Sequence, residues 1–69
     1  MDYDYLDEIA REVANDDQSR LGVLSSGEYL YVALSANECS LLGRRTVASA
    51  LARLGDESVA HLIDHHRYD

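Results

Sequence analysis

The clearest chemical spacing in this 69-residue chain belongs to two histidines, His61 and His65. They stand four positions apart, so a helix would place them on one face, with Glu57 one turn earlier. Such a pair can chelate zinc or nickel from one side. Leucine and not glutamate follows His61, so the HExxH pattern of metalloproteases is absent. We expect no metal, keep Glu57, His61 and His65 as candidate ligands, and expect the two histidines on the surface.

Cys39 is the only cysteine, which excludes both a disulfide within the chain and a zinc site built from four cysteines. A cysteine nucleophile needs a base and an orienting group, and the histidines are distant from Cys39 in the sequence. A helical chain of this length also has little room for a ligand pocket. The sequence therefore predicts no enzyme activity and no cofactor, and a small, partly buried Cys39. An exposed Cys39 would instead be able to form an intermolecular disulfide on oxidation.

The chain opens with MDYDYLDE, in which carboxylates alternate with phenols. Tyrosine is enriched at protein interfaces because it buries a large ring and keeps a polar tip. Carboxylates around it would steer the patch toward basic surfaces such as nucleic-acid channels, where they could stand in for phosphates. The alternative is a solvated helix start, with aspartates placed for the helix dipole. The predicted partner-binding residues are Asp2, Tyr3, Asp4, Tyr5, Asp7, Glu8 and Glu12.

The net charge is −7, from 13 acidic residues and six arginines with no lysine. Both ends are acidic, whereas residues 44–55 hold Arg44, Arg45 and Arg53 and no acid. Direct binding to DNA or RNA is disfavoured, because nucleic-acid-binding domains are usually basic. We expect these arginines to form salt bridges with the acidic ends, each exposed pair contributing about 0–1 kcal/mol.

Helical periodicity predicts the elements that would position these side chains. From Asp4 to Asn15 the apolar residues recur at helical spacing. The segment NDDQS then interrupts the pattern, and Asp16 or Asp17 could cap a second, short helix. The expected apolar positions are Leu6, Ile9, Ala10 and Val13 in the first helix, and Leu21, Val23 and Leu24 in the second.

The central segment SSGEYLYVALSANE allows two interpretations. Its tyrosines and valine have strand propensity, whereas Ser25 and Glu28 match the capping box that opens a helix. The apolar residues are continuous rather than alternating, and no partner strand is evident. We predict a buried central helix, with a short strand at residues 28–34 as the alternative.

Residues 46–67 have the pattern of a helical hairpin with a tight turn. Thr46 can cap the first helix, Gly55 supplies a left-handed residue, and Asp56 is a candidate N-cap for the second. The expected apolar stripes are Val47, Ala50, Leu51 and Leu54 in the first helix, and Val59, Leu62, Ile63 and His66 in the second.

These patterns predict an all-α fold: one small acidic domain over residues 1–69, built as a bundle of four to five short helices. A chain this short buries only about 60% of the surface that its unfolded form exposes. Tight helix packing, self-association or a partner must therefore support it. No signal peptide is evident, and no apolar run approaches the ~20 residues that span a bilayer. We expect a cytoplasmic protein without membrane contact.

The predicted function is non-catalytic binding to a larger protein, as an inhibitor or regulator that occupies a basic nucleic-acid-binding surface. The size, the acidity and the lack of a catalytic set resemble the general character of phage-encoded inhibitors of host defence, such as anti-CRISPR proteins. This resemblance is one of class and not of motif. Two alternatives stay open: a homodimeric structural or adaptor module, and a helical-hairpin DNA-binding regulator that uses Arg44, Arg45 and Arg53.

Overall fold

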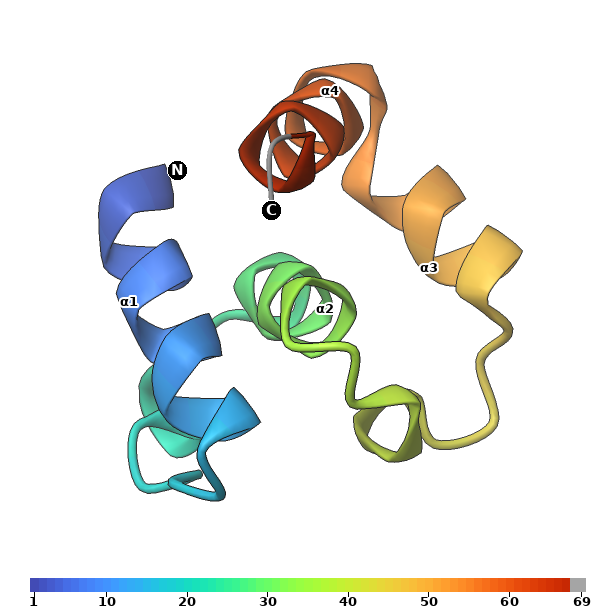
Figure 1. The fold of residues 1–69 in the computed structure, drawn as a ribbon. Helices are drawn as coiled ribbons and strands as arrows, with labels where there is room; N and C mark the ends of the chain where they lie inside the picture. Colours follow the sequence, from blue (N-terminus) through green and yellow to red (C-terminus); the bar gives the residue numbers. More distant parts are fainter. Residues whose placement is uncertain (68–69) are drawn as a thin grey trace.

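The structure, a computed structural model, describes residues 1–67, and residues 68 and 69 lie outside that description. Within the described range all regular structure is helical and no strand is present (Figure 1). The elements are α1 (Tyr3–Ala14), η1 (Leu21–Val23), α2 (Ser26–Ser35), η2 (Cys39–Leu42), α3 (Val47–Leu54) and α4 (Asp56–His66), where η denotes a short 3-10 helix. The predicted all-α fold class is confirmed, and the alternative strand at residues 28–34 is wrong.

Helix α1 forms where the apolar periodicity predicts it, with each end within one residue of the expected position. Asp2 caps it, because its Oδ1 accepts a hydrogen bond from the backbone N–H of Tyr5 at 3.2 Å. The four predicted apolar positions, Leu6, Ile9, Ala10 and Val13, are all buried. Packing of this face against α2 is therefore what fixes α1 to the rest of the molecule.

Helix α2 lies at the centre of the molecule, with α1 on one side, α3 on the other and α4 above it in Figure 1. Its capping box is present as predicted: the Ser25 hydroxyl accepts from the Glu28 N–H, and the Glu28 carboxylate accepts from the Ser25 N–H. Neighbours on several sides explain its unbroken apolar run, because a surrounded helix has no broad solvent face. Tyr31, Val32 and Ala33 are all fully buried.

The link between α1 and α2 differs from the prediction. Neither Asp16 nor Asp17 caps η1, whose N-cap is Arg20 without a side-chain hydrogen bond. The Asp17 carboxylate instead accepts bonds from the backbone N–H and the hydroxyl of Ser19, a local turn that Asp favours. Of the three predicted apolar positions only Leu21 is buried.

The helical hairpin is present, and its turn is largely as predicted. Thr46 caps α3 by accepting from the Ser49 N–H at 3.0 Å. Gly55 has φ of 85°, a left-handed conformation that costs glycine little. Asp56 is not the N-cap of α4, because Gly55 takes that position and Asp56 is the first helical residue.

The predicted apolar stripe of α4 is partly wrong. Leu62 is buried and Val59 is half-buried, but Ile63 is 56% exposed and His66 is exposed. Ser58 is buried in their place, because it faces α1 and meets the Tyr3 hydroxyl at 3.0 Å. The face of α4 that packs inward thus differs from the predicted apolar stripe: it includes the polar Ser58 and excludes Ile63 and His66.

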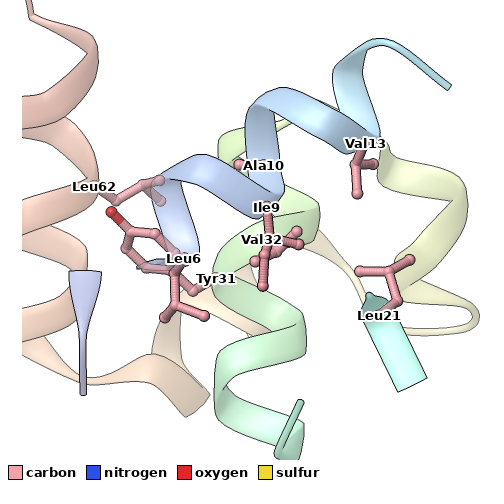
Figure 2. Packing of buried hydrophobic residues seen from close by; sticks show 8 residues of the cluster. All are labelled: Leu6, Ile9, Ala10, Val13, Leu21, Tyr31, Val32 and Leu62. Atoms are coloured by element: carbon pink, nitrogen blue, oxygen red, sulfur yellow. The ribbon is translucent and has the colours of Figure 1, made fainter. Parts of the chain in front are cut away.

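The main core joins α1, α2 and α4, as Figure 2 shows. It contains Leu6, Ile9, Ala10, Val13, Leu21, Tyr31, Val32 and Leu62. A second cluster joins the other side of α2 to η2 and α3, and contains Leu30, Ala33, Leu42 and Ala50. No helix within residues 1–67 is both long enough and apolar enough to cross a bilayer.

Candidate functional site

The predicted acidic patch divides when α1 folds, and Asp7 turns inward. Asp7 is 6% exposed, whereas the sequence suggested an accessible carboxylate. The Tyr31 hydroxyl donates to Asp7 Oδ1 at 2.8 Å. The other oxygen, Oδ2, lies 3.5 Å from His61 Nε2 and 3.4 Å from His65 Nδ1. We call Asp7, Tyr31, His61 and His65 the buried carboxylate cluster, which ties together α1, α2 and α4.

The contacts of this cluster offset the free-energy cost of burying the Asp7 carboxylate. That cost is large unless the group is hydrogen-bonded and paired. Tyr31 is the principal donor, and its own environment keeps it protonated. Burial raises the pKa of Tyr31 above its ordinary value, and the Asp7 carboxylate raises it further, because a tyrosinate there would be desolvated and repelled. Every buried side-chain nitrogen and oxygen atom within residues 1–67 has a hydrogen-bond partner.

The two N-terminal tyrosines make contacts within the chain. Tyr3 is half-buried and stacks on His61, with ring centroids 4.0 Å apart and an interplanar angle of 15°. Its hydroxyl also meets Ser58 across the junction of α1 and α4. Tyr5 lies under a guanidinium, with the Arg20 carbon 5.4 Å from the ring centroid. Both rings therefore serve the packing of the N-terminus, which reduces the area that they offer to a partner.

Arg20 neutralises part of the outer face of α1. Its Nε donates to Glu12 at 2.8 Å, and a second nitrogen contacts the same carboxylate and lies 3.3 Å from Glu8. The hydrogen bond with Glu12, followed by the charges of Glu12 and Glu8, raises the pKa of Arg20. Glu12 is thus half-buried and engaged, Asp2 caps the helix, and Asp4 and Glu8 stay exposed.

Exposed carboxylates also stand on the two helices, α1 and α4, that meet at this junction. Asp4 and Glu57 are the chain neighbours of Tyr3 and Ser58, whose hydroxyls meet across that junction. Glu8 and Asp64 are likewise the neighbours of the contacting Asp7 and His65. We call the four exposed residues, Asp4, Glu8, Glu57 and Asp64, the seam acids.

The candidate metal ligands have other neighbours than the pattern suggests. His61 and His65 share a face of α4 as expected, but both approach Asp7, while Glu57 is exposed. Within residues 1–67 no group of three or more His, Cys, Asp or Glu side chains is arranged as a metal site. Within the described residues, His61 and His65 thus contact the buried Asp7 carboxylate and not Glu57.

Ser35, Asp7, His65 and His66 line one hollow and make two separate contacts there. The Ser35 hydroxyl lies 3.0 Å from His66 Nε2, whereas the Asp7 carboxylate contacts the other two histidines, so the hydroxyl and the acid meet different imidazoles. Cys39 is exposed, and the prediction that it is partly buried is wrong. That hollow of about 270 Å³ opens beside the cluster, with Asp7, Arg11, Ser35 and His65 among its lining residues.

The three arginines of residues 44–55 do not bind the acidic ends. Arg44, Arg45 and Arg53 are exposed, and the ion pairs found within residues 1–67 do not include them. The predicted salt bridges are therefore wrong for the described part of the chain. Among the acids of α1, Asp2 caps the helix, Asp7 is buried, and Glu8 and Glu12 pair with Arg20, whereas Asp4 stays exposed.

Comparisons with models of known protein families, with curated proteins and with solved structures find no match for this chain. Its function must therefore be argued from its own side chains.

Of the predicted partner-binding residues, Asp4 and Glu8 are exposed and accessible to a partner, whereas Asp7 is buried and is not. Sequence reasoning missed Asp7 because an acid within an acidic run suggests a solvated face. A signal was nevertheless present: Tyr3, Asp7, Ala10 and Ala14 recur at helical spacing and form a stripe beside the apolar one. It also did not group Glu57 and Asp64 with the acids of α1, because only the folded hairpin brings α4 against α1.

Proposed function

We propose that this chain is a non-catalytic acidic binding module, an inhibitor or regulator that occupies a basic nucleic-acid-binding surface of a larger cytoplasmic protein. The observation that carries the proposal is the placement of the seam acids, which are exposed on two helices that contact each other. Within this class, the narrower proposal is a phage-encoded inhibitor of host defence, of the kind that anti-CRISPR proteins represent.

Rigid spacing is what such a mimic requires. Asp4 and Glu8 stand four residues apart, about 6 Å along the axis of α1. Glu57 and Asp64 stand seven apart, about 10 Å along α4. Helices joined by buried contacts hold these negative charges in fixed positions, as a nucleic-acid backbone holds its phosphates. A net charge of −7 would further speed the encounter with a basic surface.

Local pairing leaves the seam acids largely free. Glu8 shares Arg20 with Glu12, and Asp64 is 4.0 Å from an exposed Arg67 nitrogen. Asp4 and Glu57 form no ion pair within residues 1–67. Exposed pairs of this kind are weak and exchange readily with a partner's arginine or lysine.

The test is a pull-down of the tagged chain from a cytosolic extract treated with nuclease and washed at low and high salt. We expect a nucleic-acid-handling protein that is retained at low salt and released at high salt. A seam variant should lose it, while a control variant with the same net charge should retain it. The seam variant is D4N/E8Q/E57Q/D64N, and the control is D16N/D17N/E38Q/D56N.

Two results would contradict the proposal. Equal retention by the seam and control variants would show that the seam acids are merely a solvated surface. Retention of nothing but further copies of the chain at both salt concentrations would favour the homodimeric module.

One observation supports the DNA-binding alternative: Arg44, Arg45 and Arg53 are exposed, and no ion pair within residues 1–67 includes them. This alternative requires that the chain alone shift a DNA duplex at low salt, and that R44A/R45A abolish the shift. Our proposal predicts no shift, because the acidic residues exceed the arginines by seven.

A further inference from the structure

A second hollow lies on a different part of the molecule, between the start of α2, η2 and the loop before α3. Its volume is about 410 Å³, within the range of about 300–1,000 Å³ that is usual for ligand pockets. The expectation that so short a chain has little room for a pocket of this size is therefore wrong. None of the seam acids and no member of the buried carboxylate cluster lines it.

The walls of this groove are mainly apolar and are supported by the core. Four leucines and a tyrosine line it: Leu24, Leu30, Leu41, Leu42 and Tyr29. Leu30 and Leu42 are buried in the cluster that joins α2, η2 and α3, so tight packing fixes their positions. Leu24, Tyr29 and Leu41 are half-buried and supply the accessible apolar surface.

One charge accompanies these apolar walls. Among the described residues that line the groove, Arg45 alone is charged. It is exposed, and no carboxylate within residues 1–67 pairs with it, although the chain carries 13 acids. Gly43, with φ of 64°, makes the turn by which the chain leaves η2 and reaches Arg45. A guanidinium in this position matches the planar geometry of a carboxylate.

We propose that this groove binds a small apolar carboxylate, with its hydrocarbon part against the leucines and Tyr29 and its carboxylate against Arg45. A phosphate-rich ligand fits less well, because one arginine offers too little positive charge beside five apolar or aromatic walls. An uncharged hydrocarbon would leave Arg45 unused. Octanoate represents the class: it combines a flexible alkyl chain with a single carboxylate.

The experiment is a titration of octanoate, below its micellar concentration, into the full ¹⁵N-labelled chain, followed by amide chemical shifts. We expect saturable shifts at Leu24, Tyr29, Leu41 and Arg45. Octylammonium has the same alkyl chain with the opposite charge, so it should bind much more weakly. Loss of the charged contact in R45A should weaken octanoate binding about tenfold. Arg53→Ala, which removes an exposed arginine that does not line the groove, should leave it unchanged.

Three results would overturn the inference: no saturable shift with octanoate, equal affinity for octylammonium, or equal affinity of R45A and the unmodified chain. Because Arg45 is exposed, R45A should retain the native spectrum outside the groove, and the comparison of the two probes needs no variant at all. Since the seam acids do not line the groove, its failure would leave the proposed function untouched.

Discussion

Asp4 and Asp7 stand three residues apart in the same acidic run and meet opposite environments. Asp4 is exposed and has no ion pair within residues 1–67, whereas Asp7 is 6% exposed and contacts Tyr31, His61 and His65. Positions three apart differ by only about 60° around a helix. That rotation moves Asp7 from the solvent face to the edge that meets α2 and α4. A run of like charges on a helix is thus not one surface, and its members can lie in different environments.

Buried and exposed carboxylates also contribute differently to the free energy of unfolding. A buried carboxylate stabilises only while its partners remain, and removal of either side leaves a desolvated polar group. An exposed carboxylate is solvated with or without a partner, so its removal changes stability little. The inner acid should therefore be sensitive in folding experiments, and the outer acids should be sensitive only in binding experiments.

The largest effect is expected for Asp7→Ala. It leaves the Tyr31 hydroxyl buried without an acceptor and removes the charge between His61 and His65. We expect a loss of about 2–3 kcal/mol in the free energy of unfolding, measured by urea denaturation. The matched control, Asp4→Ala, should change it by no more than about 0.5 kcal/mol. Equal urea midpoints for the two variants would contradict the claim that Asp7 stabilises the fold and Asp4 does not.

Tyr31→Phe should have the next largest effect, because it keeps the ring and deletes the donor to Asp7. We expect a loss of about 1–2 kcal/mol at neutral pH. The pKa of Tyr31 is raised in the folded state, so its proton is retained at a pH where the unfolded chain, with an ordinary tyrosine pKa of about 10, releases it. Stability should therefore fall as the pH rises above about 10.

The Tyr31→Phe variant checks this alkaline dependence directly. Between about pH 10 and 11.5 its free energy of unfolding should decline less steeply than that of the unmodified chain. Parallel curves would mean that Tyr31 is not the group responsible. The measurement is urea denaturation at a series of pH values, with the far-ultraviolet circular dichroism of the helices as the probe.

A smaller effect is expected for Arg20→Gln, which tests the outer face. Loss of the guanidinium frees Glu12 and Glu8 and removes the contact over the Tyr5 ring. Because the pair is accessible to solvent, stability should fall much less than in Asp7→Ala, and the difference should shrink further in high salt. A loss as large as that of Asp7→Ala, unaffected by salt, would place Arg20 among the residues that hold the fold.

The smallest effect is expected for Asp17→Asn in the turn before η1. Hydrogen bonds from the Ser19 side chain and backbone lower the pKa of Asp17, so the carboxylate contributes stability above about pH 4 and loses it as the pH falls below. The variant should show a slightly weaker dependence of stability on pH in acid, with little change at neutral pH. A large change at pH 7 would contradict this local role.

Periodicity and capping residues were sufficient to predict most of the fold. The apolar stripe of α1, the Ser25–Glu28 capping box and the Thr46 and Gly55 boundaries of α3 all follow from local chemistry, and all are present. Local chemistry also decided between strand and helix in α2, because a satisfied capping box outweighs the strand propensity of its tyrosines.

Tertiary contacts explain what the sequence did not predict. Ile63 has the correct spacing for burial yet is exposed, because the packing of α4 against α1 and α2 selects Ser58 and Leu62 instead. Asp7 is likewise buried by partners that lie 24 and more residues away along the chain. No local pattern fixes how two helices are rotated against each other, so polar contacts across a helix junction are the hardest to predict.

The most direct test is a double-mutant cycle between Asp7→Ala and Tyr31→Phe, because the central claim is that Asp7 serves the fold through Tyr31. The free energy of unfolding is measured for the unmodified chain, both single variants and the double variant. We predict that the double variant loses less than the sum of the single losses, by about 1 kcal/mol or more. Losses that add to within about 0.3 kcal/mol would show that the two side chains are not coupled, and would contradict the division of the acidic run into an inner, structural carboxylate and outer, exposed ones.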